Sequence, residues 1–409
     1  MSLKSPRKTQ YEIRSAIIDT APTVSRPIPV RADVHLDRLR DNVSVLRTQA
    51  NDASLMAVVK ANAYGHGMTR VARALRAEGV RHFAVANVPE GARLREAGLE
   101  APIQVFAAPL AEHLPAYARH DLGVTVSSPA VAKAVVETAT AEAPLRAHVK
   151  VETGMGRIGL ARSEAERALR RLADAPHVRL VSLWTHFATA DERDLSFTRK
   201  QLRRFRALLD ELPNALLDEI EHVDVANSAA LLALPDEATA FTGPLIRTGL
   251  ALYGVAPRED MTDRLRPVMR FTARVTHLKT VTAGAPVSYG RTWIADAPSR
   301  IATVGAGYAD GYPRLLSNRA EVGIRGRRYP VVGNVCMDML MVNLGAPGGE
   351  GAAVEVGDEV VLVGEGGPSV HELACWAETI PYEIMTSVGP RVPRRYLAAK
   401  GEEEEQCES

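Results

Sequence analysis

The sequence predicts an α/β protein in which a (β/α)8 barrel of the TIM type is followed by a mostly β C-terminal domain. Short apolar runs alternate with stretches of helical period through the first two thirds of the chain, as in a parallel sheet. Beyond about Leu265, apolar residues instead alternate with polar ones at period two. The chain has 409 residues, more than one domain usually holds, so two domains are expected.

Eight apolar runs are candidate strands of the barrel. The stretches between them include segments of helical period at 71–80, 89–98 and 163–175. Eight strands with intervening helices in this length fit a closed barrel better than an open doubly wound sheet, although periodicity alone leaves the open sheet as an alternative. The candidate strands span 54–59, 82–87, 102–107, 123–128, 145–152, 178–186, 221–227 and 244–249.

The second domain is expected over 266–399. Its runs at 271–281, 300–308, 320–333 and 352–366 are broken by glycine and proline, and helical character returns only at 369–378. The barrel is expected over 28–265. The polar segment 1–27 and the acidic segment 400–409 are predicted to be disordered tails.

Composition favours a small-molecule ligand. Lys and Arg total 50 against 49 Asp and Glu, so charge gives no reason to expect nucleic acid or a membrane as partner. The three cysteines, Cys336, Cys375 and Cys407, lack CxxC spacing, so we expect no zinc cluster or other metal site and no disulfide framework. No apolar segment has the length of a signal h-region or a membrane span, which predicts a cytoplasmic protein.

Polar residues gather at the carboxyl ends of the predicted barrel strands, where barrel enzymes build their sites. In chain order these residues are Lys60, Glu152 to Arg157, His186, Asn227, Ser228 and Arg247. Each one alone is compatible with an ordinary surface position. Their joint placement at one rim predicts a single site.

A lysine at the mouth of a barrel suggests Schiff-base chemistry, because a partly desolvated amine shifts toward its neutral, nucleophilic form. The usual carbonyl partner is pyridoxal phosphate, which also needs donors for its phosphate and a group facing its pyridine nitrogen. Hydroxyl and backbone N–H groups of ANS at 226–228 and RTGL at 247–250 suit the phosphate, and Arg247 suits the nitrogen. Such glycine-containing loops are weak signals by residue type alone, so this cofactor remains a hypothesis from the residues.

Nine ordered segments identify a resemblance that spans residues 28 to 397. They are AVVKANAYGHG, KVETGMGRIG, THFATADE, ANSAA, IRTGLALYG, VSYGRTW, GYADGYPR, VGNVCMD and PYEIMTSVGPRVPRRY. Together they resemble the alanine racemase family. The resemblance implies a pyridoxal 5'-phosphate barrel joined to a β domain, with a leading strand near 28–35 in the β domain. It also implies a head-to-tail homodimer that interconverts L- and D-alanine and supplies D-alanine for peptidoglycan.

The resemblance implies two catalytic bases. Lys60 matches the lysine that holds pyridoxal 5'-phosphate and removes the α-proton of D-alanine, and Tyr289 matches the base for L-alanine, supplied by the partner subunit. Inversion at the α-carbon needs a proton to leave one face and another to arrive at the opposite face, so a single base would tend to return the proton to its own side. Arg247 matches the arginine facing the pyridine nitrogen, and a guanidinium leaves that nitrogen unprotonated.

Other positions carry further implied roles. The matched phosphate ligands, all uncharged, are Tyr64, Ser228, Gly249, Leu250 and Tyr382, and His186 and Asn227 are the neighbouring cofactor contacts. Arg157 and the backbone N–H of the partner's Met337 match the holders of the substrate carboxylate. Tyr308 matches a residue at the active-site entrance, where with Met337 it leaves room for little more than a methyl side chain. A pocket of this kind discriminates between substrates by about 1 to 3 kcal/mol for each methylene group. Lys150 matches a lysine that can carry a carbamate.

Four departures from the family's pattern stand near these residues. Glu152 replaces the more usual Asp, and Asn334 and Met339 stand where Arg and Gln are more common, so the loop around Met337 is expected to differ in shape. Asp224 occupies a position where a histidine is common, which leaves the environment of Arg247 open. None of these replaces a group implied to touch the cofactor.

Several alternatives remain at this point. Four other kinds of protein share parts of the pattern. They are a pyridoxal-phosphate barrel decarboxylase, a non-catalytic pyridoxal-phosphate-binding protein, a racemase of broader small-amino-acid specificity, and a weak racemase that sequesters alanine-like antibiotics. The decarboxylase lacks support for two reasons. The sequence shows no glycine-rich phosphate loop of that class, and Arg247 stands where the decarboxylase would have a Glu facing the pyridine nitrogen. His66, His82 and Cys336 are interpreted as packing residues.

Overall fold

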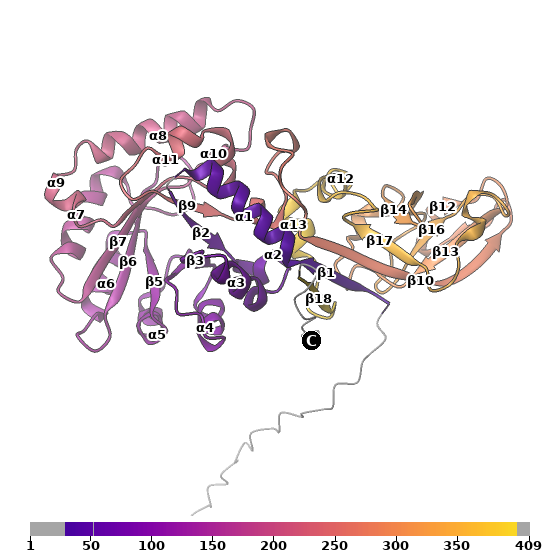
Figure 1. The fold of residues 1–409 in the computed structure, drawn as a ribbon, viewed down its shortest axis with the longest axis horizontal. Coiled ribbons are helices and arrows are strands. Elements are labelled where there is room, and N and C mark those ends of the chain that lie inside the picture. Colours follow the sequence, from indigo (N-terminus) through magenta and orange to yellow (C-terminus); the bar gives the residue numbers. More distant parts are fainter. Residues whose placement is uncertain (1–28, 52, 399–409) are drawn as a thin grey trace, which may run out of the picture.

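The computed structural model describes residues 29–51 and 53–398, so the tails predicted at 1–27 and 400–409 lie outside the described residues. The chain forms a barrel and a β domain, which lie side by side in Figure 1. No helix within the described ranges is long and apolar enough to span a membrane.

The predicted barrel is confirmed, and all eight predicted strands are present. Their order is β8-β7-β6-β5-β4-β3-β2-β9, and every neighbouring pair is parallel. The sheet closes because the backbone N–H of Arg247 donates to the carbonyl of Ala226 at 3.0 Å, so the open sheet is excluded. The strands are β2 (Ser54–Val58), β3 (His82–Val85), β4 (Ile103–Val105), β5 (Leu122–Val126), β6 (Leu145–Lys150), β7 (Val178–Trp184), β8 (His222–Asp224) and β9 (Leu245–Thr248).

Helices cover the outside of the barrel because each presents an apolar stripe to the strands. In α7, Ala165, Ala168, Leu169 and Leu172 are all buried, at the i, i+3, i+4, i+7 spacing of one helical face. These helices are α1 (Leu36–Ala50), α3 (Met68–Ala77), α4 (Val88–Glu96), α5 (Leu114–Arg119), α6 (Pro129–Thr138), α7 (Arg162–Ala173), α8 (Ser196–Leu209), α9 (Asn214–Leu217), α10 (Ser228–Ala233) and α11 (Pro235–Thr239). The short segment α2 (Lys60–Tyr64), which follows β2, is a left-handed turn instead.

The β domain is built around one long strand, β10 (Met269–Val281). It pairs with β1 (Arg31–His35), β13 (Ser299–Val304) and β17 (Glu359–Val363), all antiparallel. The first strand of the described chain therefore lies in the sheet of the β domain. The remaining elements are β11 (Pro286–Val287), β12 (Trp293–Ile294), β14 (Glu321–Ile324), β15 (Arg327–Pro330), β16 (Leu340–Asn343), β18 (Arg394–Leu397), α12 (Val370–Trp376) and α13 (Pro381–Thr386).

The two domains meet through buried polar contacts rather than a simple linker. The side-chain amide of Asn42 in α1 donates to the carbonyls of Leu252 and Arg266 at 3.1 and 2.9 Å, and its oxygen accepts from the Arg266 N–H at 2.8 Å. From the other side, Arg394 in β18 donates to the carbonyl of Gly65 at 3.1 Å. These bonds fix the end of the β domain that bears α13 against the loop after Lys60.

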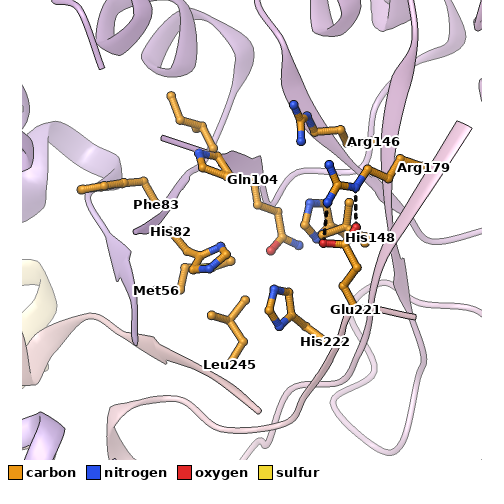
Figure 2. Close-up of a pocket in the computed structure, with 13 residues that line it drawn as sticks. Met56, His82, Phe83, Gln104, Arg146, His148, Arg179, Glu221, His222 and Leu245 are labelled. Carbon is orange, nitrogen blue, oxygen red and sulfur yellow. Dashed lines mark hydrogen bonds and ion pairs between the residues drawn. The ribbon is translucent and has the colours of Figure 1, made fainter. Parts of the chain in front are cut away.

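The interior of the barrel is unusually polar for this fold, whose centre is normally filled by branched apolar side chains. Gln104, His148 and His222 line a cavity at one end (Figure 2), and Lys150 and Arg247 line a cavity at the other. Polar side chains are costly to bury without partners, and of these five only Gln104 and Lys150 have buried side-chain nitrogen or oxygen atoms without a hydrogen-bond partner among the described residues.

Candidate active site

A cavity of about 750 Å³ opens beyond the carboxyl ends of the barrel strands, where the sequence predicted a site. It brings together most of the predicted site residues, from six different segments of the chain. Those that line it are Lys60, Tyr64, Lys150, Arg157, His186, Asn227, Ser228, Arg247, Gly249, Leu250 and Tyr382. Tyr382 comes from α13 of the β domain, and the others come from the barrel.

Lys60 stands at the start of a left-handed turn. Ala61 to Tyr64 have φ values of 51°, 53°, 55° and 52°, although none is glycine. Such a conformation costs about 1 to 2 kcal/mol per residue, so surrounding contacts must hold it. Glu90 accepts from the Ala61 N–H at 2.7 Å, and the side chain of Asn62 accepts from the Met68 N–H at 2.9 Å. Backbone strain maintained in this way is typical of functional sites, and here it presents Lys60 to the cavity.

The amine of Lys60 is shifted toward its neutral form. Burial lowers its pKa from the ordinary value of 10.5, the cationic Arg157 lowers it further, and Glu90 opposes both. A less protonated amine at the mouth of a barrel is a better nucleophile and a better proton acceptor.

Burial, an ion pair and hydrogen bonds fix the position of the Arg247 side chain. It is only 3% exposed, and its Nη1 forms an ion pair with Asp224. Its Nη2 donates to the carbonyl of Thr185 at 2.8 Å and to Nδ1 of His186 at 3.0 Å. Asp224, which departs from the family's pattern, thus has a defined role as the charge partner of Arg247.

His186 is held as a neutral imidazole. Burial lowers its pKa well below 6.5, and the charge of Arg247 lowers it further. Because Nδ1 accepts from Arg247, the proton of the neutral ring is assigned to Nε2. The ring is therefore a donor toward the cavity rather than a cation.

Lys150 and Arg247 lie against the same indole ring. The Lys150 ammonium lies 5.0 Å from the ring centre of Trp184, and the Arg247 guanidinium lies 4.9 Å from it. Burial, together with the positive charges of Arg157 and Arg247, lowers the pKa of Lys150 to about 8. Its Nζ has no hydrogen-bond partner within the described part of the chain. A buried amine in this state is a reactive group as well as a costly one.

The opposite wall of the cavity offers uncharged donors. The Gly249 N–H donates to Oγ of Ser228 at 2.9 Å, and the rings of Tyr64 and Tyr382 lie 5.9 Å apart. Burial raises the pKa of Tyr382 to about 12 and that of Tyr64 further, so both hydroxyls keep their protons. A Cβ at position 249 would lie 2.8 Å from the Tyr64 hydroxyl, so only glycine leaves this wall open.

Asn227 lines the cavity and also caps a helix. Its side chain accepts from the Ala230 N–H at 2.9 Å and caps α10. The cap fixes the start of α10, which begins at Ser228, and so orients the Ser228 hydroxyl toward the cavity.

Three predicted residues are absent from this cavity. Tyr289, Tyr308 and Met337 lie in the β domain and are 74%, 43% and 53% exposed. They belong to one connected surface, because the Asn334 side chain donates to the Tyr289 carbonyl at 2.7 Å and the Tyr308 N–H donates to the Cys336 carbonyl at 3.1 Å. Asn334, a departure from the family's pattern, therefore supports the backbone of Tyr289.

Two residues that shape the site, Trp184 in the cavity lining and Glu90 beside the turn after Lys60, were not predicted from the sequence. Trp184 lies two positions before His186 on a predicted strand, so the period-two alternation that places His186 also places Trp184 inward. Glu90 gave no local signal, because it reaches Ala61 from the first turn of α4, 29 residues away.

The chain matches known proteins over nearly its whole described length. Residues 34–257 match the model for the alanine racemase N-terminal domain, and residues 268–396 match that for the C-terminal domain. The chain is 40% identical over 375 residues to an alanine racemase from Halothermothrix orenii, covering 90% of this chain and 97% of that protein. It is 40% identical over 391 residues to one from Chlorobaculum tepidum, covering 94% and 98%.

Solved structures are equally similar. An alanine racemase from Clostridium difficile 630 superposes with a TM-score of 0.85 at 34% identity, covering 93% of this chain and 98% of that one. The Bacillus anthracis alanine racemase with bound L-Ala-P superposes with a TM-score of 0.81 at 33% identity, covering 93% and 97%.

Proposed function

The chain belongs to the alanine racemase family, and we propose that it interconverts L- and D-alanine in the cytoplasm by a two-base reaction with pyridoxal 5'-phosphate, supplying D-alanine for peptidoglycan. The observation that carries the proposal is the meeting of Lys60 and Arg247 in one cavity at the carboxyl ends of the strands. Both domains match the family, so the enzyme is classed as an alanine racemase, an isomerase.

The residues present fit pyridoxal 5'-phosphate. Lys60 provides an amine shifted toward its nucleophilic form, and the glycine at 249 leaves open a wall of uncharged donors for a phosphate. We assign the phosphate to Tyr64, Ser228, Gly249, Leu250 and Tyr382. When bound, pyridoxal 5'-phosphate supplies the aldehyde and the electron-withdrawing ring that acidify the α-proton of an amino acid.

We assign Arg247 to the pyridine nitrogen. Its guanidinium is a permanent donor that does not release its proton, so it leaves the ring nitrogen unprotonated and the ring a weaker electron sink. Asp224 balances its charge, and Thr185 and His186 hold its orientation. We expect this arrangement to favour return of the proton to the α-carbon over side reactions that would consume the cofactor.

The two bases are assigned to different subunits. Lys60 holds or releases a proton on one face of the substrate, and Tyr289 of the partner subunit does so on the other. A tyrosine that is 74% exposed in the monomer gains a function if a second copy covers it. Met337 and Tyr308 lie on the same exposed surface, which supports a homodimer with shared sites.

The substrate carboxylate is assigned to Arg157 and to the backbone N–H of Met337 from the partner subunit, because a guanidinium suits a planar carboxylate. Tyr308 and Met337 would narrow the entrance and favour the small side chain of alanine. Lys150, buried without a partner near Arg157, suits a carbamate that would turn a cation into an anion able to orient Arg157.

A two-part experiment tests this proposal. Borohydride treatment of the purified protein should fix pyridoxal phosphate covalently to Lys60, as mapped by peptide mass, and Lys60→Arg should abolish the label. In heavy water, wild type should racemise L-alanine with deuterium entering at the α-carbon. Tyr289→Phe should retain the cofactor but lose α-proton exchange of L-alanine, whereas the buried control Tyr117→Phe should keep both. Normal exchange in Tyr289→Phe contradicts the two-base assignment, and absence of racemisation in wild type contradicts the function.

A further inference from the structure

Residues 152–160 form the loop that carries Arg157 at the carboxyl end of β6. The loop is closed at its base, because the Leu160 N–H donates to the carbonyl of Lys150 at 2.8 Å and the Glu152 N–H donates to the carbonyl of Leu160 at 2.9 Å. It contributes to the walls of two cavities. The residues on the active-site cavity are Met155, Arg157 and Ile158, and those on a separate cavity of about 470 Å³ are Glu152, Thr153, Gly154 and Gly156. Glu152 is thus not among the residues that line the active site.

The side chain of Arg157 is not fixed by contacts of its own. Within residues 29–51 and 53–398, its guanidinium has neither a hydrogen-bond partner nor an ion-pair partner. Its charge lowers the pKa of both Lys60 and Lys150, so these neighbours repel the guanidinium rather than hold it. The position of the guanidinium therefore depends on the backbone of the loop.

The backbone of the loop has little order of its own. Gly154 and Gly156 have φ values of 141° and 70°, and glycine loses more conformational freedom on folding than any other residue. The N–H groups of residues 154–158 have no backbone acceptor among the described residues. Arg204 donates to the carbonyl of Thr153 at 2.7 Å, but this contact holds only the start of the loop. The stretch that leads to Arg157 therefore needs another group to order it.

The carboxylate of Glu152 supplies this group. Its Oε1 accepts from the Gly154 N–H, and its Oε2 accepts from the Gly156 N–H at 2.9 Å. Burial opposes the ionised form, but these two N–H groups, together with those of Met155 and Arg157, outweigh it and hold the pKa of Glu152 below its ordinary 4.5. Successive N–H groups that converge on one anion form a nest, and the charge makes such hydrogen bonds stronger than neutral ones. Glu152 is therefore ionised at neutral pH and ties the loop together from within.

We propose that Glu152 is a positioning residue, whose carboxylate orders residues 154–157 and so places the Arg157 guanidinium where it receives the substrate carboxylate. This role rests on the proposed function, in which Arg157 binds that carboxylate. It differs from the role of Lys150, because the proposed carbamate would act on the guanidinium itself, whereas Glu152 acts on the backbone that carries it. A glutamine at position 152 has nearly the same size, but one of its oxygens becomes an NH2 group that faces an N–H donor. Glu152→Gln should therefore release the loop while every group that touches substrate or cofactor is kept.

Hydrogen exchange of the holoenzyme measures the order of the loop independently of activity. In wild type at pH 7, the amides of Gly154 and Gly156 should exchange about tenfold or more slower than in an unstructured chain, and Glu152→Gln should remove this protection. Glu164→Gln is the matched control, because the Glu164 carboxylate accepts from the Ala161 N–H at 3.0 Å, just beyond the loop. It should leave the exchange of Gly154 and Gly156 unchanged. Unprotected amides in wild type, or equal exchange in wild type and Glu152→Gln, would overturn the proposal.

Propionate, which has the carboxylate and the carbon frame of alanine without its amine, measures the placement of Arg157. Its dissociation constant from the holoenzyme, followed by saturation-transfer NMR, should rise about tenfold or more in both Glu152→Gln and Arg157→Gln. It should stay within about threefold of wild type in Glu164→Gln and in Glu152→Asp, which keeps the charge.

The kinetics of Glu152→Gln should follow the same pattern. The KM for L-alanine should rise about tenfold while kcat stays within about threefold of wild type, because the guanidinium holds the carboxylate equally in the ground state and the transition state. Normal propionate binding by Glu152→Gln, or binding by Glu152→Asp as weak as by Glu152→Gln, would overturn the positioning role alone. Normal propionate binding by Arg157→Gln would instead overturn the assignment of Arg157 on which that role rests.

Discussion

Acid should weaken the turn that carries Lys60 through one buried histidine, His66. This residue is fully buried, its Nδ1 donates to the carbonyls of Ala63 and Tyr64 at 2.9 and 3.0 Å, and its ring stacks on Tyr253 at 4.5 Å. Its Nε2 has no partner among the described residues, so a second proton would be buried without an acceptor. Burial lowers the pKa of His66 to about 4, against the small opposing effect of its two backbone hydrogen bonds.

The size of the effect follows from linkage. In the unfolded chain His66 binds a second proton with a pKa of about 6.5, whereas in the folded chain it does so only when the pH nears 4. Stability contributed by neutral His66 is therefore present above pH 6.5 and is lost as the pH falls toward 4. From pH 7 to pH 5 the loss is about 2 kcal/mol for this one residue.

Urea unfolding of wild type and His66→Asn at pH 7, 6 and 5 measures this loss. The asparagine keeps a donor for the two carbonyls but does not titrate, so its unfolding free energy should fall by about 2 kcal/mol less than that of wild type between pH 7 and pH 5. Its stability at pH 7 should be lower, because the stacked ring is gone. The exposed control His113→Asn should follow wild type. Equal pH slopes for His66→Asn and wild type would refute the reasoning.

Two further changes test the turn and its neighbours. Gly67→Ala would place a Cβ 1.8 Å from the Tyr396 hydroxyl at a φ of 96°, so it should lower the unfolding free energy by more than about 2 kcal/mol. The control Gly98→Ala, with φ 84° and open space around it, should lower it by only about 1 kcal/mol. Similar urea midpoints for the two variants would contradict this prediction. Glu90→Gln removes the charge that raises the pKa of Lys60, so the pH profile of cofactor attachment to Lys60 should move to lower pH, and an unchanged profile would show that Glu90 acts only as an acceptor.

The barrel strands could be predicted because each is a short apolar run buried on both sides, a signal that depends only on local sequence. All eight are present, and β5 begins one residue before its predicted start. The pairing of β1 with β10 is different in kind. Arg31 lies opposite Thr272, which is far away in the sequence, and no local pattern encodes that partnership; the resemblance implied only that the leading strand lies in the β domain.

The site residues also divide into those that local sequence predicts and those that depend on tertiary contacts. The polar residues at strand ends could be placed from the rule that barrel sites gather at one rim. The left-handed turn after Lys60 could not, because only Asn62 among its residues favours positive φ, and tertiary contacts such as that from Glu90 hold the flanking Ala and Tyr residues there. Asp224 stood out only as a departure, and its partnership with Arg247 needed neighbouring barrel strands to be brought together. The role proposed for Tyr289 depends on a second chain, which a single sequence does not describe.

The assembly of one site from two chains is tested most directly by mixing two inactive variants, Lys60→Ala and Tyr289→Phe. In a mixed dimer, one site receives Lys60 and Tyr289 from the two intact positions, and the other site receives both substitutions. Random exchange of equal amounts makes half of the dimers mixed, so we predict recovery of about a quarter of wild-type racemase activity. Mixed dimers that form but show no activity would contradict the shared site, because they would place both bases in the same chain.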